Sequence, residues 1–181
     1  SWLPTYGTIF LSAANTGDFS DPNNIVYGHH LNNGSMFACF ADFADQATFD
    51  EHRTIYLLTP QGNYRLTTFS LMHVDENDPL AQTRFTDDAA RVEYVQDKID
   101  RSVVKADGIA AASDMGRTFA FATCDNVVSS KRYVLFASVT ESTADASADP
   151  DAVQAVGEAA AETTGEAAGE ASSGDAGEAT A

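Results

Sequence analysis

Short apolar runs alternate with turn-forming segments along the first 140 residues, a pattern typical of a β-rich domain. The turns are marked by Gly, Pro, Asn and Asp, which interrupt regular structure at the points where the apolar runs end. The segment 16–24 is the longest such interruption in the first part of the chain and predicts a loop. The predicted strands cover residues 7–11, 25–27, 54–59, 64–74, 118–123 and 132–139.

Two segments instead carry apolar residues three and four positions apart, which predicts helices. Residues 36–43 follow a turn and form the shorter of the two. Residues 86–101 form the longer one, which begins in a polar run, 86–88, suited to capping a helix. The apolar face of this second helix comprises Ala89, Ala90, Val92, Val95 and Ile99.

The composition changes beyond Thr143, where Ala, Gly, Glu, Ser and Thr dominate and no aromatic residue occurs. Val153 and Val156 are the only large aliphatic residues there, so the segment lacks the apolar surface that would offset chain entropy. We therefore expect one folded domain, residues 1–142, followed by a low-complexity acidic tail, residues 143–181, that is disordered.

The formal net charge of −17 argues against a nucleic-acid or anionic membrane partner, because phosphate contacts need clustered Lys and Arg. The last basic residue is Arg132, and ten of the 27 acidic residues lie from Glu141 onward, so the tail carries much of this charge. The chain has no apolar stretch near the roughly 20 residues that span a bilayer. We expect it to be a processed piece of a longer protein.

The two cysteines, Cys39 and Cys124, permit one disulfide, but they fit equally one reactive thiol and one buried, inert thiol, which is the interpretation we favour. Cys124 ends a predicted strand and precedes a polar turn. A thiol becomes a useful nucleophile when a base or a cation lies nearby. Arg132 comes eight residues later, where a hairpin would return it to Cys124 with its charge available to an oxyanion.

Four histidines could supply the base. His29 follows a strand and a glycine, whose backbone freedom allows a close approach. His30 is interpreted as a solvated neighbour, His52 as a surface residue and His73 as partly buried. On spacing alone, ordinary packing and surface charge explain these residues better than a cysteine transferase or hydrolase does.

Three motifs resemble those of the sortase family. The run NIVYGH at 24–29, with GSMF at 34–37, resembles the stretch around the family's catalytic histidine. The run AFATC at 120–124 is similar to its cysteine box, although Ala120 and Phe121 stand where the family has Thr and Leu. The run KRYV at 131–134 resembles the segment that holds the family's arginine.

The class comes from the long helix predicted before the cysteine strand, which resembles that of class B sortases. The resemblance covers roughly residues 3–140. It implies an eight-stranded, mostly antiparallel β-barrel with helical insertions, whose N-terminal part is missing here. Leu3 would then correspond to the end of that missing region, where the family has a residue lining its substrate groove.

The resemblance further implies a cysteine transpeptidase that uses no metal or organic cofactor. It assigns His29 as acid and base, Cys124 as nucleophile and Arg132 as oxyanion stabiliser, and it makes Ala122 and Thr123, like Leu3, substrate-binding residues. Cys39 would be a small core residue.

The implied partners are secreted surface proteins that carry a C-terminal sorting signal, and an amine of a peptidoglycan precursor. The implied location is the outer face of the cell membrane or the cell wall, with a membrane anchor outside this piece. Alternatives are a sortase that polymerises pilins, a cysteine peptidase and a catalytically degenerate binding barrel.

Overall fold

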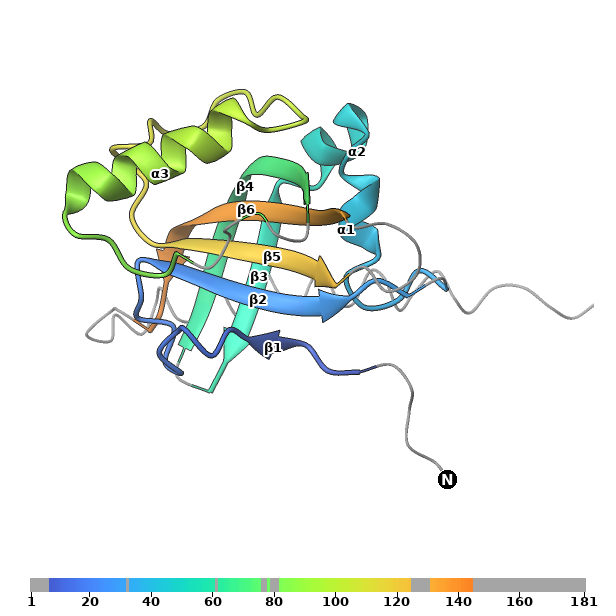
Figure 1. Cartoon of the computed structure of the whole chain (residues 1–181), viewed down its shortest axis with the longest axis horizontal. Helices are drawn as coiled ribbons and strands as arrows, with labels where there is room; N and C mark the ends of the chain where they lie inside the picture. The colour runs from blue at the N-terminus through green and yellow to red at the C-terminus, as the bar shows by residue number, and fades with distance from the viewer. Residues whose placement is uncertain are drawn as a thin grey trace, which may run out of the picture. The chain divides into compact units, whose positions relative to one another are not determined.

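The computed structural model describes residues 7–31, 33–60, 62–75, 78, 82–124 and 131–144, with Cys124 described by its backbone alone. The elements along the chain are β1 (Phe10–Leu11), β2 (Asn23–His29), α1 (Cys39–Asp42), α2 (Gln46–Glu51), β3 (Thr54–Thr59), β4 (Gly62–Asp75), α3 (Asp88–Asp100), β5 (Thr118–Cys124) and β6 (Lys131–Ser142). Strands dominate, which confirms the predicted mostly-β class (Figure 1).

The strands form a six-stranded sheet in the order β1-β2-β5-β6-β4-β3. β1 pairs antiparallel with β2, and β5 pairs antiparallel with β6. The strands β2 and β5 run parallel, an exception that a mostly antiparallel barrel allows. The parallel direction follows from the crossover between the two strands, because residues 30–117 return the chain to the end of the sheet at which β2 began. The implied count of eight strands stays a prediction.

Most predicted elements are present with shifted ends. The strand expected at 25–27 extends over all of β2, and the helix expected at 86–101 is α3, capped by Asp87, whose side chain accepts a hydrogen bond from Ala90 N–H. The helix expected at 36–43 is shorter, since only Cys39–Asp42 is helical. The helix α2, which is capped by Asp45, was not predicted from the sequence.

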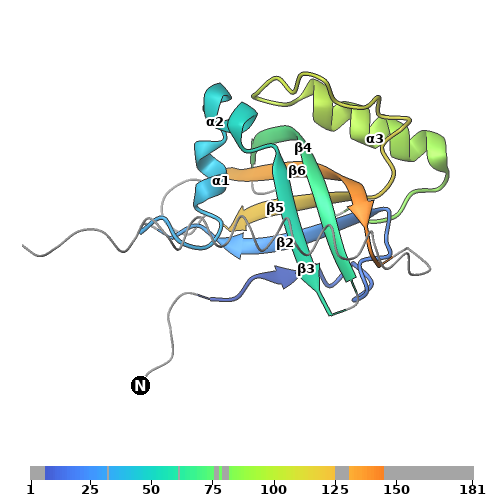
Figure 2. The same cartoon turned by 180° about the vertical axis from the view of Figure 1, so that it is seen from behind.

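The chain divides into two compact units, one made of Ser1–Ile55 with Leu66–Thr140 and the other of Tyr56–Arg65 with Glu141–Ala181. The core of the first unit lies where α3 packs on the sheet (Figures 1 and 2). Burial of these side chains is the main stabilising contribution to this unit. The core comprises Ile25, Phe69, Met72, Val74, Tyr94, Val95, Ala112, Met115, Ala120, Ala122, Val134 and Phe136.

In the second unit, residue 143 pairs with a residue of β4. Thr143 N–H donates to the carbonyl of Asn63 at 2.9 Å, and Asn63 N–H donates to Thr143 Oγ1 at 2.8 Å. Ala144 lies against Gly62, because a Cβ on that glycine would come within 2.6 Å of Ala144 Cα. The ordered pairing therefore continues to residues 143 and 144, which the sequence analysis assigned to the tail; residues 145–181 lie outside the described residues.

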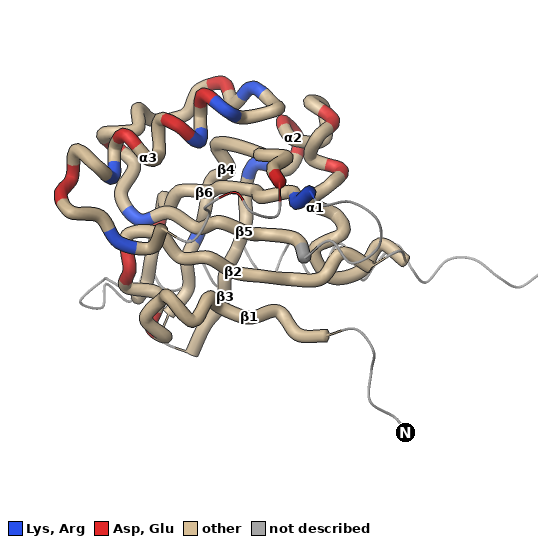
Figure 3. Tube along the Cα trace, viewed as in Figure 1, with Lys and Arg blue, Asp and Glu red and all other residues tan. Residues whose placement is uncertain are grey.

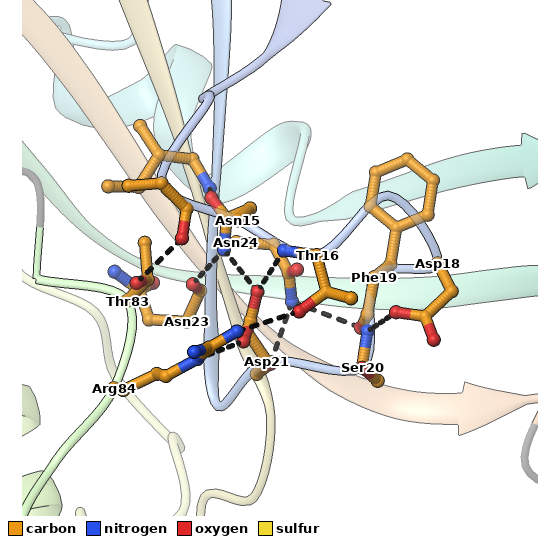
Figure 4. A network of polar contacts seen from close by, with 12 residues as sticks. Asn15, Thr16, Asp18, Phe19, Ser20, Asp21, Asn23, Asn24, Thr83 and Arg84 are labelled. Atoms are coloured by element: carbon orange, nitrogen blue, oxygen red, sulfur yellow. Dashed lines mark hydrogen bonds and ion pairs between the residues drawn. The ribbon is translucent and has the colours of Figure 1, made fainter.

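The amino end of β2 is held by a buried polar network (Figure 4). The Asp21 carboxylate accepts hydrogen bonds from Thr16 N–H, from Asn15 Nδ2 at 3.1 Å and from Arg84 Nε at 2.9 Å. Burial alone would raise the pKa of Asp21, but these hydrogen bonds outweigh it and lower the pKa to about 2. The network therefore fixes the loop that leads into β2 while Asp21 remains ionised.

Charged residues are unevenly distributed over the first unit (Figure 3). They gather on α3 and its neighbouring loops, whereas the paired strands β2 and β5 contain no Lys, Arg, Asp or Glu. At the carboxyl ends of these strands, positive charge comes from Lys131 and Arg132, the first residues of β6. The start of β6 therefore supplies positive charge at this end of the sheet.

Candidate active site

The parallel pairing of β2 and β5 brings two of the predicted catalytic residues into register. Their pairing runs from Asn23 opposite Thr118 to Gly28 opposite Thr123 and His29 opposite Cys124. Neighbouring strands lie about 4.8 Å apart. The backbones of His29 and Cys124 therefore adjoin each other although 94 residues separate them in the chain. The side chain of Cys124 lies outside the described residues.

Arg132 reaches the same place through the pairing of β5 with β6, in which Ala122 lies opposite Val134. The next residues on the two strands are joined by the hydroxyl of Thr123, which donates to the carbonyl of Tyr133 at 3.2 Å and accepts from its N–H at 3.1 Å. Cys124 and Arg132 are the residues directly beyond this clamp. The start of β6 thus lies beside the end of β5, near α1 (Figure 1).

The backbone of His29 is fixed by the segment that follows it in the chain. Phe37 N–H donates to the carbonyl of His29 at 2.9 Å. The Phe37 ring packs on Gly28, because a Cβ there would lie 2.5 Å from Phe37 Cγ. Phe37 also contacts Phe121 of β5 edge-on, with ring centroids 6.1 Å apart. Gly28 and Phe37 therefore fix the backbone of His29 together.

Two of the predicted substrate-binding residues are buried. Ala122 is part of the core, and Thr123 is 1% exposed with its hydroxyl engaged by Tyr133. Leu3 and the connection 125–130 lie outside the described residues. Contact of Leu3, Ala122 and Thr123 with substrate stays a prediction, whereas the clamp gives Thr123 a structural role that its position in the motif did not indicate.

His30 follows His29 but lies in a different environment. It lines a cavity of about 300 Å³ together with Leu31 and Asp42. The backbone of His30 forms an isolated bridge with Met36, at the turn that leads to α1. His30 is partly exposed.

Cys39 is exposed and free, so the prediction of a buried core residue is wrong, and no disulfide joins it to Cys124. The reason is local. The helix begins at Cys39, and the neighbouring Phe37, Ala38 and Phe43 take the buried positions. Partial burial of the sulfur, and then the charge of Asp42, raise the pKa of the Cys39 thiol. A raised pKa makes Cys39 a poor nucleophile despite its exposure.

The prediction that His73 is partly buried is also wrong. His73 is exposed and stacks on Tyr133, with ring centroids 4.3 Å apart and planes 5° apart. It lies between the buried Met72 and Val74, so the alternation of β4 turns it outward. His52 is exposed, as predicted.

No three His, Cys, Asp or Glu side chains among the described residues are close enough together to hold a metal ion. The helices in the described part of the chain are all too short or too polar to cross a bilayer. What the geometry provides is a histidine and a cysteine in backbone register beside an arginine. These features define a candidate site for cysteine-dependent acyl transfer.

Comparisons with known proteins agree with this class. No protein-family model matches the chain. The chain is 27% identical over 135 residues to sortase B of Staphylococcus aureus, covering 74% of this chain and 54% of that protein. The chain spans about half the length of the curated relatives it matches.

Solved structures give the same result. Sortase B from the type II pilus of Streptococcus pneumoniae is 32% identical, with a TM-score of 0.64, covering 74% of this chain and 76% of that one. A complex of Staphylococcus aureus sortase B with substrate is 27% identical, with a TM-score of 0.67, covering 75% of this chain and 62% of that one. The chain therefore belongs to the sortase family, class B type.

Proposed function

We propose that this chain is the catalytic part of a cell-surface transpeptidase that joins secreted proteins to an amine through a thioester on Cys124. The observation that carries the proposal is the register of β2 with β5, which sets His29 opposite Cys124, with Arg132 at the start of the adjoining strand. The relative solved with a bound substrate supports the same reading.

In the first step, the Cys124 thiolate attacks the carbonyl carbon of the threonine in a sorting signal. Arg132 stabilises the oxyanion, because its guanidinium stays protonated and presents a planar set of donors. His29 donates a proton to the departing amine as the carbon–nitrogen bond breaks. The products are a thioester on Cys124 and a free C-terminal fragment.

In the second step, an acceptor amine attacks the thioester carbonyl. His29, now neutral, takes a proton from that amine, and the carbon–sulfur bond breaks to release the Cys124 thiolate. A new amide bond forms between the surface protein and the acceptor. We propose an amine of a peptidoglycan precursor as the acceptor. A pilin lysine is the second candidate, favoured by the likeness to a pilus sortase B.

The test is the intact mass of the protein after mixing with sorting-signal peptides, first without and then with each amine. A thioester on Cys124 that disappears when amine is added, with a ligated peptide as product, supports the proposal. Cys124→Ala should abolish the adduct, and Cys39→Ala is the matched control that should retain it. Release of the free acid at a rate independent of amine would identify a cysteine peptidase, and no acylation at all would favour a binding barrel.

A further inference from the structure

Gly7, which opens the apolar run ahead of β1, lies directly against the imidazole of His29. A Cβ built on Gly7 would lie 2.1 Å from His29 Cδ2 and 2.2 Å from His29 Nε2. The next ring atom, Cγ, would be 3.3 Å away. The Cα of Gly7 therefore packs on one edge of the ring, the edge that contains Nε2 and Cδ2.

No L side chain fits between these two residues, because Cβ atoms essentially never approach other heavy atoms closer than 3.0 Å. Relief would require the ring or the Gly7 backbone to move by roughly 1 Å. The backbone of His29 has little freedom to yield, since it is paired with β5 and accepts a hydrogen bond from Phe37 N–H. On the His29 side, the movement would therefore fall on the imidazole and not on the backbone.

Gly7 also has a positive φ of 70°, a conformation that glycine adopts without strain. Two requirements thus coincide at this residue, one on the backbone angle and one on the empty space beside His29. Gly108 has nearly the same angle, 68°, but a Cβ there would meet nothing within 4 Å. The chain therefore contains a matched position that has the first requirement without the second.

We propose that Gly7 is a positioning residue for the reaction, because the absence of its side chain sets the orientation of the His29 imidazole. This inference rests on the proposed function of His29 as acid and base. Among the described residues, the imidazole receives no hydrogen bond that could orient it, so the shape of its surroundings takes that role. A misplacement of a catalytic group by about 1 Å can lower a rate by about 100-fold.

The experiment compares substitutions at Gly7 and Gly108 in the same chain. Gly7→Ala and Gly108→Ala impose the same backbone strain and should lower the melting temperature by similar amounts. Only Gly7→Ala should lower kcat for transfer, by about 10- to 100-fold, with KM changed less than about two-fold. Equal kcat in the two variants would overturn the proposal.

A second pair separates strain from collision and protects against a variant that fails to fold. Asparagine tolerates positive φ better than other residues with a Cβ, so Gly7→Asn relieves the strain but keeps the collision with His29. It should remain as impaired as Gly7→Ala, while Gly108→Asn should resemble the unmodified protein. Recovery of kcat by Gly7→Asn would show that only the backbone angle matters and would overturn the proposal.

The readout specific to positioning is the NMR spectrum of the His29 ring, recorded across pH with ¹⁵N-labelled histidine. We expect the His29 ring signals to change in both Gly7 variants and in neither Gly108 variant. Unchanged ring signals in an inactive Gly7 variant would overturn the proposal. The ring signals do not depend on turnover, so they still test the role of Gly7 if the unmodified chain acylates no peptide, a result that would contradict the proposed function alone.

Discussion

The two ends of strand β2 are held in different ways. At the amino end, the Asn23 side chain donates to the carbonyl of Gln82 at 2.9 Å and to Tyr94 Oη at 3.2 Å, and accepts from Thr118 Oγ1 at 3.0 Å. At the carboxyl end, the His29 imidazole has no hydrogen bond within the described part of the chain. The ring packs instead against Gly7, while Gly28 packs against Phe37, whose N–H donates to the backbone carbonyl of His29.

This difference suggests that the amino end of β2 serves the stability of the fold and that its carboxyl end serves the reaction. Buried polar groups that satisfy each other contribute to folding, and removing one partner leaves another unsatisfied. An imidazole whose nitrogens stay available can instead exchange protons with a substrate. Substitutions at the amino end should therefore reduce stability, and substitutions at the carboxyl end should reduce activity.

The largest effect is expected for His29→Gln, which removes the proposed acid and base but keeps a polar side chain of similar size. The transfer rate should fall by about 10²- to 10⁴-fold, the usual contribution of general acid–base catalysis. The melting temperature should stay nearly unchanged, because no hydrogen bond in the described residues depends on the ring. The measurement is the rate of ligated peptide formation, with His30→Gln as the neighbouring control. Comparable losses in both variants would remove the distinction between the two histidines.

The next effect is expected for Arg132→Lys, which keeps the charge and loses the planar fork of donors. Loss of an oxyanion donor costs about 100-fold or more in kcat. We expect slower acylation in a single-turnover measurement, with the Thr123 clamp on Tyr133 intact. Lys131→Arg is the control, since it exchanges the same two residue types one position earlier on β6. Full activity of Arg132→Lys would show that charge alone suffices.

A smaller effect, and one on stability, is expected for Asp21→Asn at the amino end of β2. The neutral amide weakens the charge-assisted hydrogen bonds from Thr16 and Arg84, so the free energy of unfolding should fall by about 2 kcal/mol. Acylation of Cys124 should remain within about two-fold of the unmodified rate. Asp18→Asn is the control, because exposed Asp18 accepts a local hydrogen bond from Ser20 N–H at 3.0 Å. Denaturant unfolding measures the stability of both variants. A lost acylation rate in folded Asp21→Asn would show that the amino end of β2 also affects the activity at its carboxyl end.

The same residue gives a pH dependence of known sign. The pKa of Asp21 is lowered to about 2 in the folded protein, against about 3.9 in an unfolded chain. Its contribution is complete above pH 3.9 and is lost as the pH falls towards 2, because protons then bind the unfolded state first. The difference in unfolding free energy between the unmodified protein and Asp21→Asn should therefore shrink below about pH 4. A difference that stays constant from pH 6 to pH 2.5 would contradict this assignment.

The sequence predicted those parts of the fold that depend on local pattern. Alternation along residues 64–74 identified most of β4, and the cap of α3 is a local signal too. The buried face of α3 was predicted only in part, because Val95 is buried but Ala89 is exposed, and the buried Tyr94 was missed. The segment of α2 was missed because Phe49 is its only large apolar residue, which leaves no periodicity to detect. Cys39 was placed in the core because the expected helix was too long, which changed the residues assigned to its buried face.

The candidate site shows a similar division. His29, Cys124 and Arg132 were identified by resemblance, because residue spacing alone favoured ordinary packing and surface charge. The pairing of β2 with β5 joins residues 95 positions apart, and no local pattern states which strand a given strand will pair with. The contact of Gly7 with His29 depends on the pairing of β1 with β2, in which Phe10 lies opposite Tyr27, so it became visible only in three dimensions.

The smallest effect is expected at the end of the domain, where the chain contributes to neither end of β2. Truncation after Ala144 removes residues whose composition gives them little apolar surface to bury, so the melting temperature should change by less than about one degree.

Truncation after Ser142 is the sharper counterpart, because it also removes the two hydrogen bonds between Thr143 and Asn63. Their loss should cost about 1 to 2 kcal/mol, or a few degrees. Both truncations should leave acylation of Cys124 unchanged, which calorimetry and intact mass measure together. A large drop in melting temperature after the first truncation would show that the acidic segment packs on the domain, and a lost acylation rate would show that it serves the site.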